Sequence, residues 1–166
     1  MTSVSWRAMA AADLAAVSNI AAAVHPDFPE EDAVFAERLA LCPDGCHVLV
    51  HEGDIAGYVI SHPWTAGSCP PLNALLGSLP TDADSFYIHD LALLPLARGS
   101  GAAVSIVDVL KDVARSAGYP RIGLVAVNNS AGFWRRQGFE SAEGAAMAAK
   151  LASYGADARY MTCSLG

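Results

Sequence analysis

The chain has 166 residues, enough for one hydrophobic core, and we expect a single domain over 1–166. Hydrophobic residues make up 53% of the chain, but no apolar run is long enough to span a membrane, so we expect no membrane partner. The first residues lack a signal-peptide pattern, and we therefore expect a cytoplasmic protein. The net charge of −7 argues against a nucleic-acid partner, and it is explained either by solubility or by steering of a cationic substrate.

The N-terminal quarter predicts one strand and two helices. A short apolar strand over 4–9 is followed by a helix over 11–24, whose large apolar residues recur on one face. Two prolines in 25–30 break that helix. The acidic start of 30–41 suits the N-terminus of a second helix.

A hairpin and a long connection come next. Two apolar runs around Glu-Gly-Asp in 46–62 indicate a β-hairpin. The segment 63–84 holds four prolines and is too long for an ordinary connection. It is either a functional loop or a solvated insertion with one helical turn at LNALLGSL.

The second half predicts alternating strands and helices. A strand over 86–94 is apolar at nearly every position and therefore buried on both faces. We expect a helix over 101–118, a strand over 121–127, a short helix over 128–138 and a last strand over 158–165. This order predicts a layered α/β fold with helices on both faces of one sheet.

The four cysteines leave two interpretations. Cys42, Cys46 and His47 could suggest a metal site, but a C-x3-C pair without a second pair is a weak signal. We therefore expect no metal, and partly buried thiols at all four positions, which include Cys69 and Cys163.

The sequence Arg98-Gly99-Ser100-Gly101-Ala102-Ala103 joins the strand 86–94 to the next helix. Glycines after a strand and before a helix let backbone N–H groups approach an anion. A Walker A loop is excluded because alanines follow the last glycine. A dinucleotide fingerprint fits poorly, because Val104 replaces its third glycine and Arg121 stands where an acidic residue is expected.

The loop and the residues after it resemble the GNAT superfamily of N-acetyltransferases. The resemblance covers most of residues 3–165 and is most specific over 86–139. It is carried by Pro95, the loop Arg98–Ala103, Asn128, Ala131, Phe133, Trp134, Gly138 and Phe139. It implies a GNAT fold with a mixed, mostly antiparallel sheet of about six to seven strands.

The resemblance also implies an activity. We expect acetyl-CoA as co-substrate and direct transfer of its acetyl group, in a ternary complex, to a primary amine of a small molecule or peptide. A non-catalytic acyl-CoA-binding module is the alternative, and a homodimer is compatible with the apolar composition.

The implied cofactor site combines the glycine loop with a β-bulge in the strand 86–94. Backbone N–H groups near Leu91 and Leu93 would face the pantetheine arm and the thioester oxygen, although core packing alone also explains these leucines. The cofactor-binding residues expected are Leu91, Ala92, Leu93, Arg98, Gly99, Ser100, Gly101, Ala102, Ala103, Asn128 and Trp134.

For catalysis the resemblance implies that His89, with Tyr87 on the same face, or Asp90 acting through water takes a proton from the amine. A structural pairing of Asp90 with His89 or with a helix terminus is the alternative. Trp134 stands where the resemblance implies a tyrosine acid for the leaving thiolate. An indole N–H cannot act as an acid in water, so Trp134 would only donate a hydrogen bond, another hydroxyl such as that of Tyr87 would substitute, or the thiolate would leave unaided.

The resemblance implies that the acceptor lies between the region of the first two helices and the segment 63–84, and we expect it at Phe28, Glu30 and Trp64. Glu30 could recognise an ammonium group or simply stabilise the start of a helix. Trp64 could line an aromatic pocket or anchor its own loop.

Overall fold

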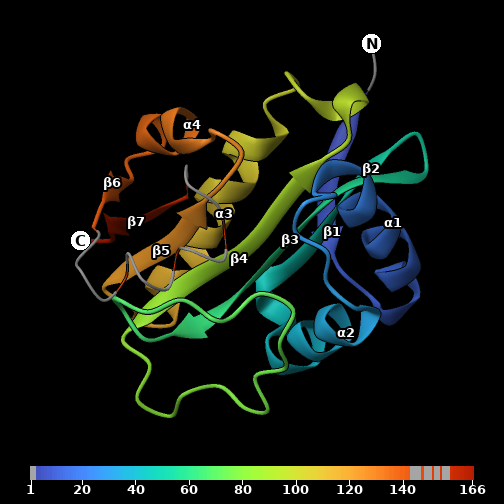
Figure 1. The fold of residues 1–166 in the computed structure, drawn as a ribbon. Coiled ribbons are helices and arrows are strands. Elements are labelled where there is room, and N and C mark those ends of the chain that lie inside the picture. The colour runs from blue at the N-terminus through green and yellow to red at the C-terminus, as the bar shows by residue number, and fades with distance from the viewer. Residues whose placement is uncertain (1–2, 143–146, 148–150, 152–153, 155–157) are drawn as a thin grey trace.

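The computed structural model describes residues 3–142, 147, 151, 154 and 158–166. A seven-stranded sheet with the order β1-β2-β3-β4-β5-β7-β6 forms the centre (Figure 1). Its only parallel neighbours in the described part of the chain are β4 and β5, which confirms the mixed, mostly antiparallel prediction. The strands are β1 (Val4–Ala8), β2 (Cys46–His51), β3 (Asp54–Trp64), β4 (Ser85–Leu93), β5 (Arg121–Ala126), β6 (Glu140–Ser141) and β7 (Arg159–Ser164).

Helices cover both faces of the sheet, as predicted. Helices α1 (Leu14–Val24) and α2 (Asp32–Leu41) share one hydrophobic cluster with β2 and β3. Helices α3 (Ala102–Ser116) and α4 (Ala131–Arg136) share another with β4, β5 and β7. No helix in the described residues is long and apolar enough to cross a membrane.

Strand β3 shows how the two clusters are separated. Side chains alternate between the faces of a strand, so Tyr58 and Ile60 pack with α1 and α2 while Val59 packs with α3. All three side chains are fully buried. The sheet therefore separates two cores, and a side chain's position along β3 decides which one it enters.

The segment between β3 and β4 differs from one of the expectations. It contains turns at 66–67, 72–73 and 81–82 and no helix, so the helical turn that one of the two interpretations placed at LNALLGSL is wrong. The Glu37 carboxylate on α2 accepts hydrogen bonds from the backbone N–H groups of Leu76 (2.6 Å) and Gly77 (3.0 Å). Backbone bonding to α2 replaces the hydrogen bonds within a helix and holds this loop against the domain.

A β-bulge in β4 opens the sheet. Consecutive residues Ile60 and Ser61 of β3 pair with Asp90 and Ile88, so His89 is an extra residue on β4. The described pairing of β4 with β5 covers only Phe86–Ile88. Beyond Ile88, the side of β4 that faces β5 is therefore free to line a cleft.

Leu110 tests how strongly stability depends on the α3 cluster. It is fully buried there, whereas Val109 on the same helix is 40% exposed. We expect Leu110→Ala to lower the free energy of unfolding by about 2–5 kcal/mol because it leaves a cavity. Val109→Ala should change it by less than about 0.5 kcal/mol. Urea unfolding of both variants measures the difference, and equal losses would contradict this packing.

Candidate active site

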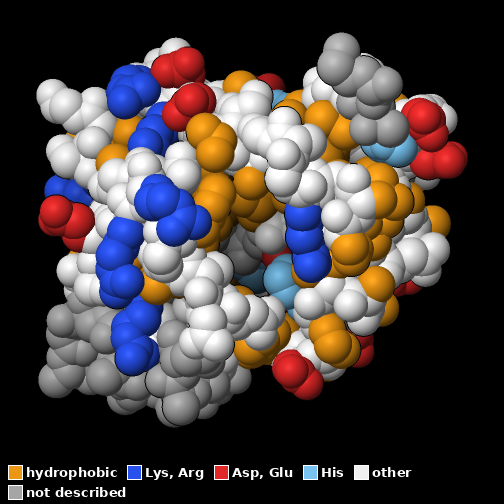
Figure 2. Space-filling model, turned by 90° about the horizontal axis from the view of Figure 1, so that it is seen from above, with side chains coloured by type: hydrophobic (Ala, Val, Ile, Leu, Met, Phe, Trp, Pro, Cys, Tyr) orange, Lys and Arg blue, Asp and Glu red, His pale blue; other side chains and the backbone are white. Residues whose placement is uncertain are grey.

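A cleft of about 810 Å³ opens where β4 and β5 part. Figure 2 shows it as a hollow at the centre of one face, with hydrophobic side chains around it and Lys and Arg side chains gathered along one side. One wall is the bulged half of β4 and the opposite wall is the end of β5 with the start of α4. The loop before α3 and the loop after α1 complete the cleft.

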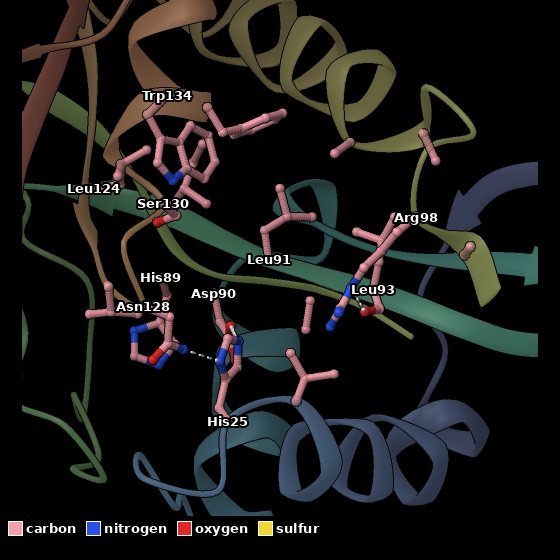
Figure 3. A pocket seen from close by; sticks show the side chains of 18 of the residues that line it. His25, His89, Asp90, Leu91, Leu93, Arg98, Leu124, Asn128, Ser130 and Trp134 are labelled. Carbon is pink, nitrogen blue, oxygen red and sulfur yellow. Dashed lines mark hydrogen bonds and ion pairs between the residues drawn. The ribbon is translucent and has the colours of Figure 1, made fainter. Parts of the chain in front are cut away.

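Backbone N–H groups of β4 are directed into this cleft. Leu94 N–H donates to Ala56 O of β3 at 2.8 Å, so N–H groups at even positions of this half of the strand point toward β3. Those of Leu91 and Leu93 then point the opposite way, to the open edge. The Arg98 Nε–H donates to Leu93 O at 3.2 Å, which places that carbonyl on the same open edge (Figure 3).

The glycine loop lies at the outer end of the cleft. Gly99 and Gly101 have φ of +78° and +82°, left-handed conformations that favour glycine. Gly101 is the N-cap of α3, and the first turn of the helix lines the cleft, so the positive end of the helix dipole lies there. The Ala102 N–H donates to Ser100 Oγ at 3.3 Å, which leaves the N–H groups that follow it for an anion. Ser100 instead turns its hydroxyl back to Ala97 O at 2.7 Å and does not line the cleft.

The bulge places two consecutive side chains of β4 beside the same hollow. His89 Nε2 lies 2.8 Å from Glu30 Oε1, and Asp90 Oδ1 lies 2.9 Å from His25 Nε2. In a regular strand, neighbouring side chains point to opposite faces. The extra residue therefore allows two histidine–carboxylate pairs to form next to each other.

The pair of His25 and Asp90 continues into the core. Tyr58 O–H donates a short hydrogen bond to Asp90 Oδ2. On the other side of the imidazole, Asn128 Nδ2 lies 3.5 Å from His25 Nδ1 (Figure 3). The result is a line of four side chains from β3 to the loop after β5, with His25 at the edge of the cleft.

The environment of these groups shifts their pKa values. Burial lowers the pKa of His25, but the contact with Asp90, the charges of Asp90 and Glu30 and the Leu91 backbone together raise it above its usual 6.5. Burial, followed by the Asp90 charge, raises the pKa of Tyr58 well above 10. Tyr58 therefore keeps its proton and remains a donor to the carboxylate.

A second, small cavity of about 40 Å³ adjoins the cleft. Its walls include Phe28 and Glu30, two of the three expected acceptor residues, and Tyr87. The side chains shared by cleft and cavity are His25, His89, Asp90, Val125 and Val127. Whatever occupies the two hollows would meet at the two histidine–carboxylate pairs.

Comparison with known families identifies this architecture. The model of the acetyltransferase (GNAT) family matches residues 13–139. The chain belongs to the GNAT family. No curated protein matches the sequence at a significant level.

Solved structures share the GNAT fold at low sequence identity. The chain is similar to the GphF GNAT-like decarboxylase in complex with isobutyryl-CoA, with a TM-score of 0.82, 16% identity and coverage of 98% of this chain and 100% of that one. For the loading GNATL domain of CurA from Lyngbya majuscula, the TM-score is 0.77 and the sequence identity is 12%, and the match covers 98% of each chain. For the ribosomal-protein-S18-alanine N-acetyltransferase from Escherichia coli, the TM-score is 0.66 and the sequence identity is 17%, and the match covers 100% of this chain and 95% of that one.

The two tryptophans expected in the GNAT site lie in different places. Trp134 lines the cleft and packs edge-to-face on Phe133 and Phe139. Trp64 lines neither hollow. Its ring packs edge-to-face on His62, with centroids 5.5 Å apart, and it belongs to a cluster with Tyr87. Of the three residues expected to bind the acceptor, Phe28 and Glu30 line the small cavity, whereas Trp64 lies outside both hollows.

His25 and Tyr58 were not among the expected catalytic residues. The only sequence signal at His25 is the His-Pro pair at the end of the first helical pattern. Tyr58 looks like any apolar residue of a buried strand. Their relation to Asp90 arises only from the pairing of β3 with β4 and from the packing of α1 on that sheet.

The glycine loop yields a binding test. We expect Gly101→Glu to weaken binding of coenzyme A more than 100-fold, because the new carboxylate would repel phosphate at the start of α3. Gly118→Glu is the matched control, since Gly118 also has a positive φ (+88°), has open space around it and lies outside the cleft. Isothermal titration calorimetry of both variants measures the effect. A normal affinity for Gly101→Glu would contradict the assignment of the loop.

Proposed function

We propose that this GNAT protein is an N-acetyltransferase that moves the acetyl group of acetyl-CoA directly to the primary amine of a small molecule. The observation that carries the proposal is the meeting of two hollows at the bulge of β4. One hollow has an anion-binding loop and an open strand edge, and the other is small and carries two carboxylates. The two substrates could therefore lie end to end, and proximity would supply much of the rate.

The residues of the cleft fit a coenzyme A thioester. The N–H groups at the start of α3 suit its pyrophosphate, and the open edge of β4 suits the amides of its pantetheine arm. The N–H groups of Leu91 and Leu93 point to where they can polarise the thioester carbonyl. When bound, the thioester would supply an activated acetyl group.

The small cavity supports a small cationic acceptor. Its volume of about 40 Å³ has room for roughly three water-sized groups, which is too little for a peptide. Glu30 and Asp90 contribute carboxylates, and no Lys or Arg is among the wall residues that the structure describes. Phe28, Tyr87 and Tyr154 add aromatic surface that favours an ammonium group.

The reaction needs a proton acceptor for the amine and a way for the thiolate to leave. His25, His89 and Asp90 lie where the substrates meet, and residue types that transfer protons are thus gathered at that point. Tyr87 is a poor acid for the thiolate, because burial raises its pKa well above 10. Trp134 can only donate a hydrogen bond, so the thiolate would leave without a tyrosine acid.

Decarboxylation of an acyl-CoA is the second candidate. It is favoured by the similarity to the GphF decarboxylase, which extends over the whole of that chain. Loss of CO₂ from a carboxylate beta to the thioester carbonyl would leave an electron pair on the α-carbon, which then takes up a proton. The carboxylates of Glu30 and Asp90 disfavour this reaction, because they would repel the carboxylate of such a substrate.

A direct assay separates the two candidates. We expect the purified protein to release free thiol from acetyl-CoA when ethylamine is added, and much less with a peptide of five residues. We expect no CO₂ release from malonyl-CoA. The Gly101→Glu variant serves as the control that links turnover to the cleft.

Two outcomes would overturn the proposal. Release of CO₂ from malonyl-CoA without amine-dependent thiol release would favour the decarboxylase. Tight binding of acetyl-CoA with no reaction of either kind would favour the non-catalytic acyl-CoA-binding module.

A further inference from the structure

The two histidines at the meeting point differ in which nitrogen is accessible. His89 uses Nε2 for Glu30, both side chains are at most 4% exposed, and Nδ1 is buried without a partner. His25 uses Nε2 for Asp90 and is 15% exposed. Its Nδ1 makes a long contact of 3.5 Å with Asn128 Nδ2, and both residues line the cleft (Figure 3). Only His25 therefore combines a carboxylate on one nitrogen with a second nitrogen directed to the reaction space.

Asp90 has no free oxygen for direct proton transfer. Oδ1 contacts His25 and Oδ2 accepts from Tyr58, and Asp90 is 14% exposed. The Tyr58 hydroxyl comes from β3, where its ring is fully buried against α2. Both carboxylate oxygens are thus fixed from opposite sides, which orients Asp90 toward the imidazole.

The backbone also prepares His25 to carry a positive charge. It is the C-cap of α1, with its N–H bonded to Ala21 O at 2.8 Å, so it lies at the negative end of the helix dipole. The contact between Nε2 and Asp90 Oδ1 is short but not aligned as a linear hydrogen bond. Catalytic hydrogen bonds are often loose without substrate and tighten in the complex.

We propose that His25 is the catalytic base of this site, and that Asp90 and Tyr58 are positioning residues that hold its imidazole with Nδ1 toward the acceptor amine. The inference rests on the proposed function and names the residue that performs its proton transfer. Asp90 keeps the proton on Nε2 and stabilises the imidazolium that forms. Tyr58 holds the carboxylate in that orientation.

The proton balance of the transfer is complete with these groups. An ammonium acceptor gives one proton to Nδ1 of His25 and becomes a nucleophile. Its nitrogen then bonds to the thioester carbonyl carbon, the C–S bond breaks and its electron pair stays on sulfur. The nitrogen loses a second proton, which ends on that sulfur, while the proton on His25 passes to water.

The groups that face His25 set its pH dependence. Asp90 of β4 and Glu30 before α2 are the anions around it, Asn128 is neutral, and His89 is held by Glu30. The base must be neutral, so kcat/KM should rise with pH through the pKa of His25. Removing the Asp90 charge lowers that pKa, so the rise should move to lower pH while the rate falls.

The test measures turnover and titration on the same variants. For His25→Gln we expect kcat with the amine acceptor to fall at least about 100-fold, the usual contribution of a general base, and the acidic limb of the profile to disappear. For Asp90→Asn we expect a similar loss with the limb displaced to lower pH. For Tyr58→Phe we expect a loss of about tenfold, typical of one hydrogen bond to a charged group.

A second readout does not depend on turnover. NMR titration of the histidine ring signals in the unliganded protein should show the His25 signal with a pKa above 6.5, shifted to lower pH in Asp90→Asn. His51→Gln is the control variant and should leave the His25 titration unchanged, since His51 on β2 lies outside both hollows. Affinity for coenzyme A and the far-UV circular dichroism spectrum should stay unchanged in His25→Gln, which separates a chemical role from a loss of the fold.

The outcomes separate this inference from the proposed function. If the wild type transfers acetyl to no amine, the proposed function fails and the inference falls with it. If the wild type is active and His25→Gln keeps its rate and its pH profile, only the role of His25 is wrong. An unchanged His25 titration in Asp90→Asn would also overturn the pairing.

Discussion

The extra residue in β4 is the constraint on which the rest of the site depends. With His89 inserted opposite Ile60 and Ser61, β4 bends and its pairing with β5 ends at Ile88. A regular pairing would have used the N–H groups of Leu91 and Leu93 in the sheet. The bulge leaves them at an open edge, and the space between the two strands becomes the cleft.

The same residue explains why charged groups gather in an apolar part of the fold. Burying a carboxylate is costly unless it has a partner. Asp90 has His25 and Tyr58, and Glu30 has His89 and the backbone N–H of Asn73 at 3.0 Å. Each carboxylate is paired with a histidine from an element that is far away in the sequence. The pairs therefore tie the α1–α2 region and the β3–β4 loop to the edge of β4.

Sequence reasoning succeeded where the signal is local. The loop Arg98–Ala103 carries its conformation in its own glycines, and the apolar strands around it predict the sheet that presents it. Sequence reasoning failed at LNALLGSL, because Glu37 and other groups outside that segment provide the hydrogen-bond partners of its backbone. It also missed His25 and Tyr58, since their importance comes from contacts with Asp90 that no spacing in the sequence reveals. The alternative of a structural pairing for Asp90 came closest, although the partner is the histidine at the end of α1.

The most direct test of the central claim is a crystal structure with acetyl-CoA bound. We expect pyrophosphate oxygens on the N–H groups that follow Arg98, the thioester oxygen near the N–H groups of Leu91 and Leu93, and the acetyl carbon beside His25 Nδ1. Acetyl-CoA bound elsewhere, or bound in the cleft with its acetyl group directed away from His25 and Asp90, would contradict it.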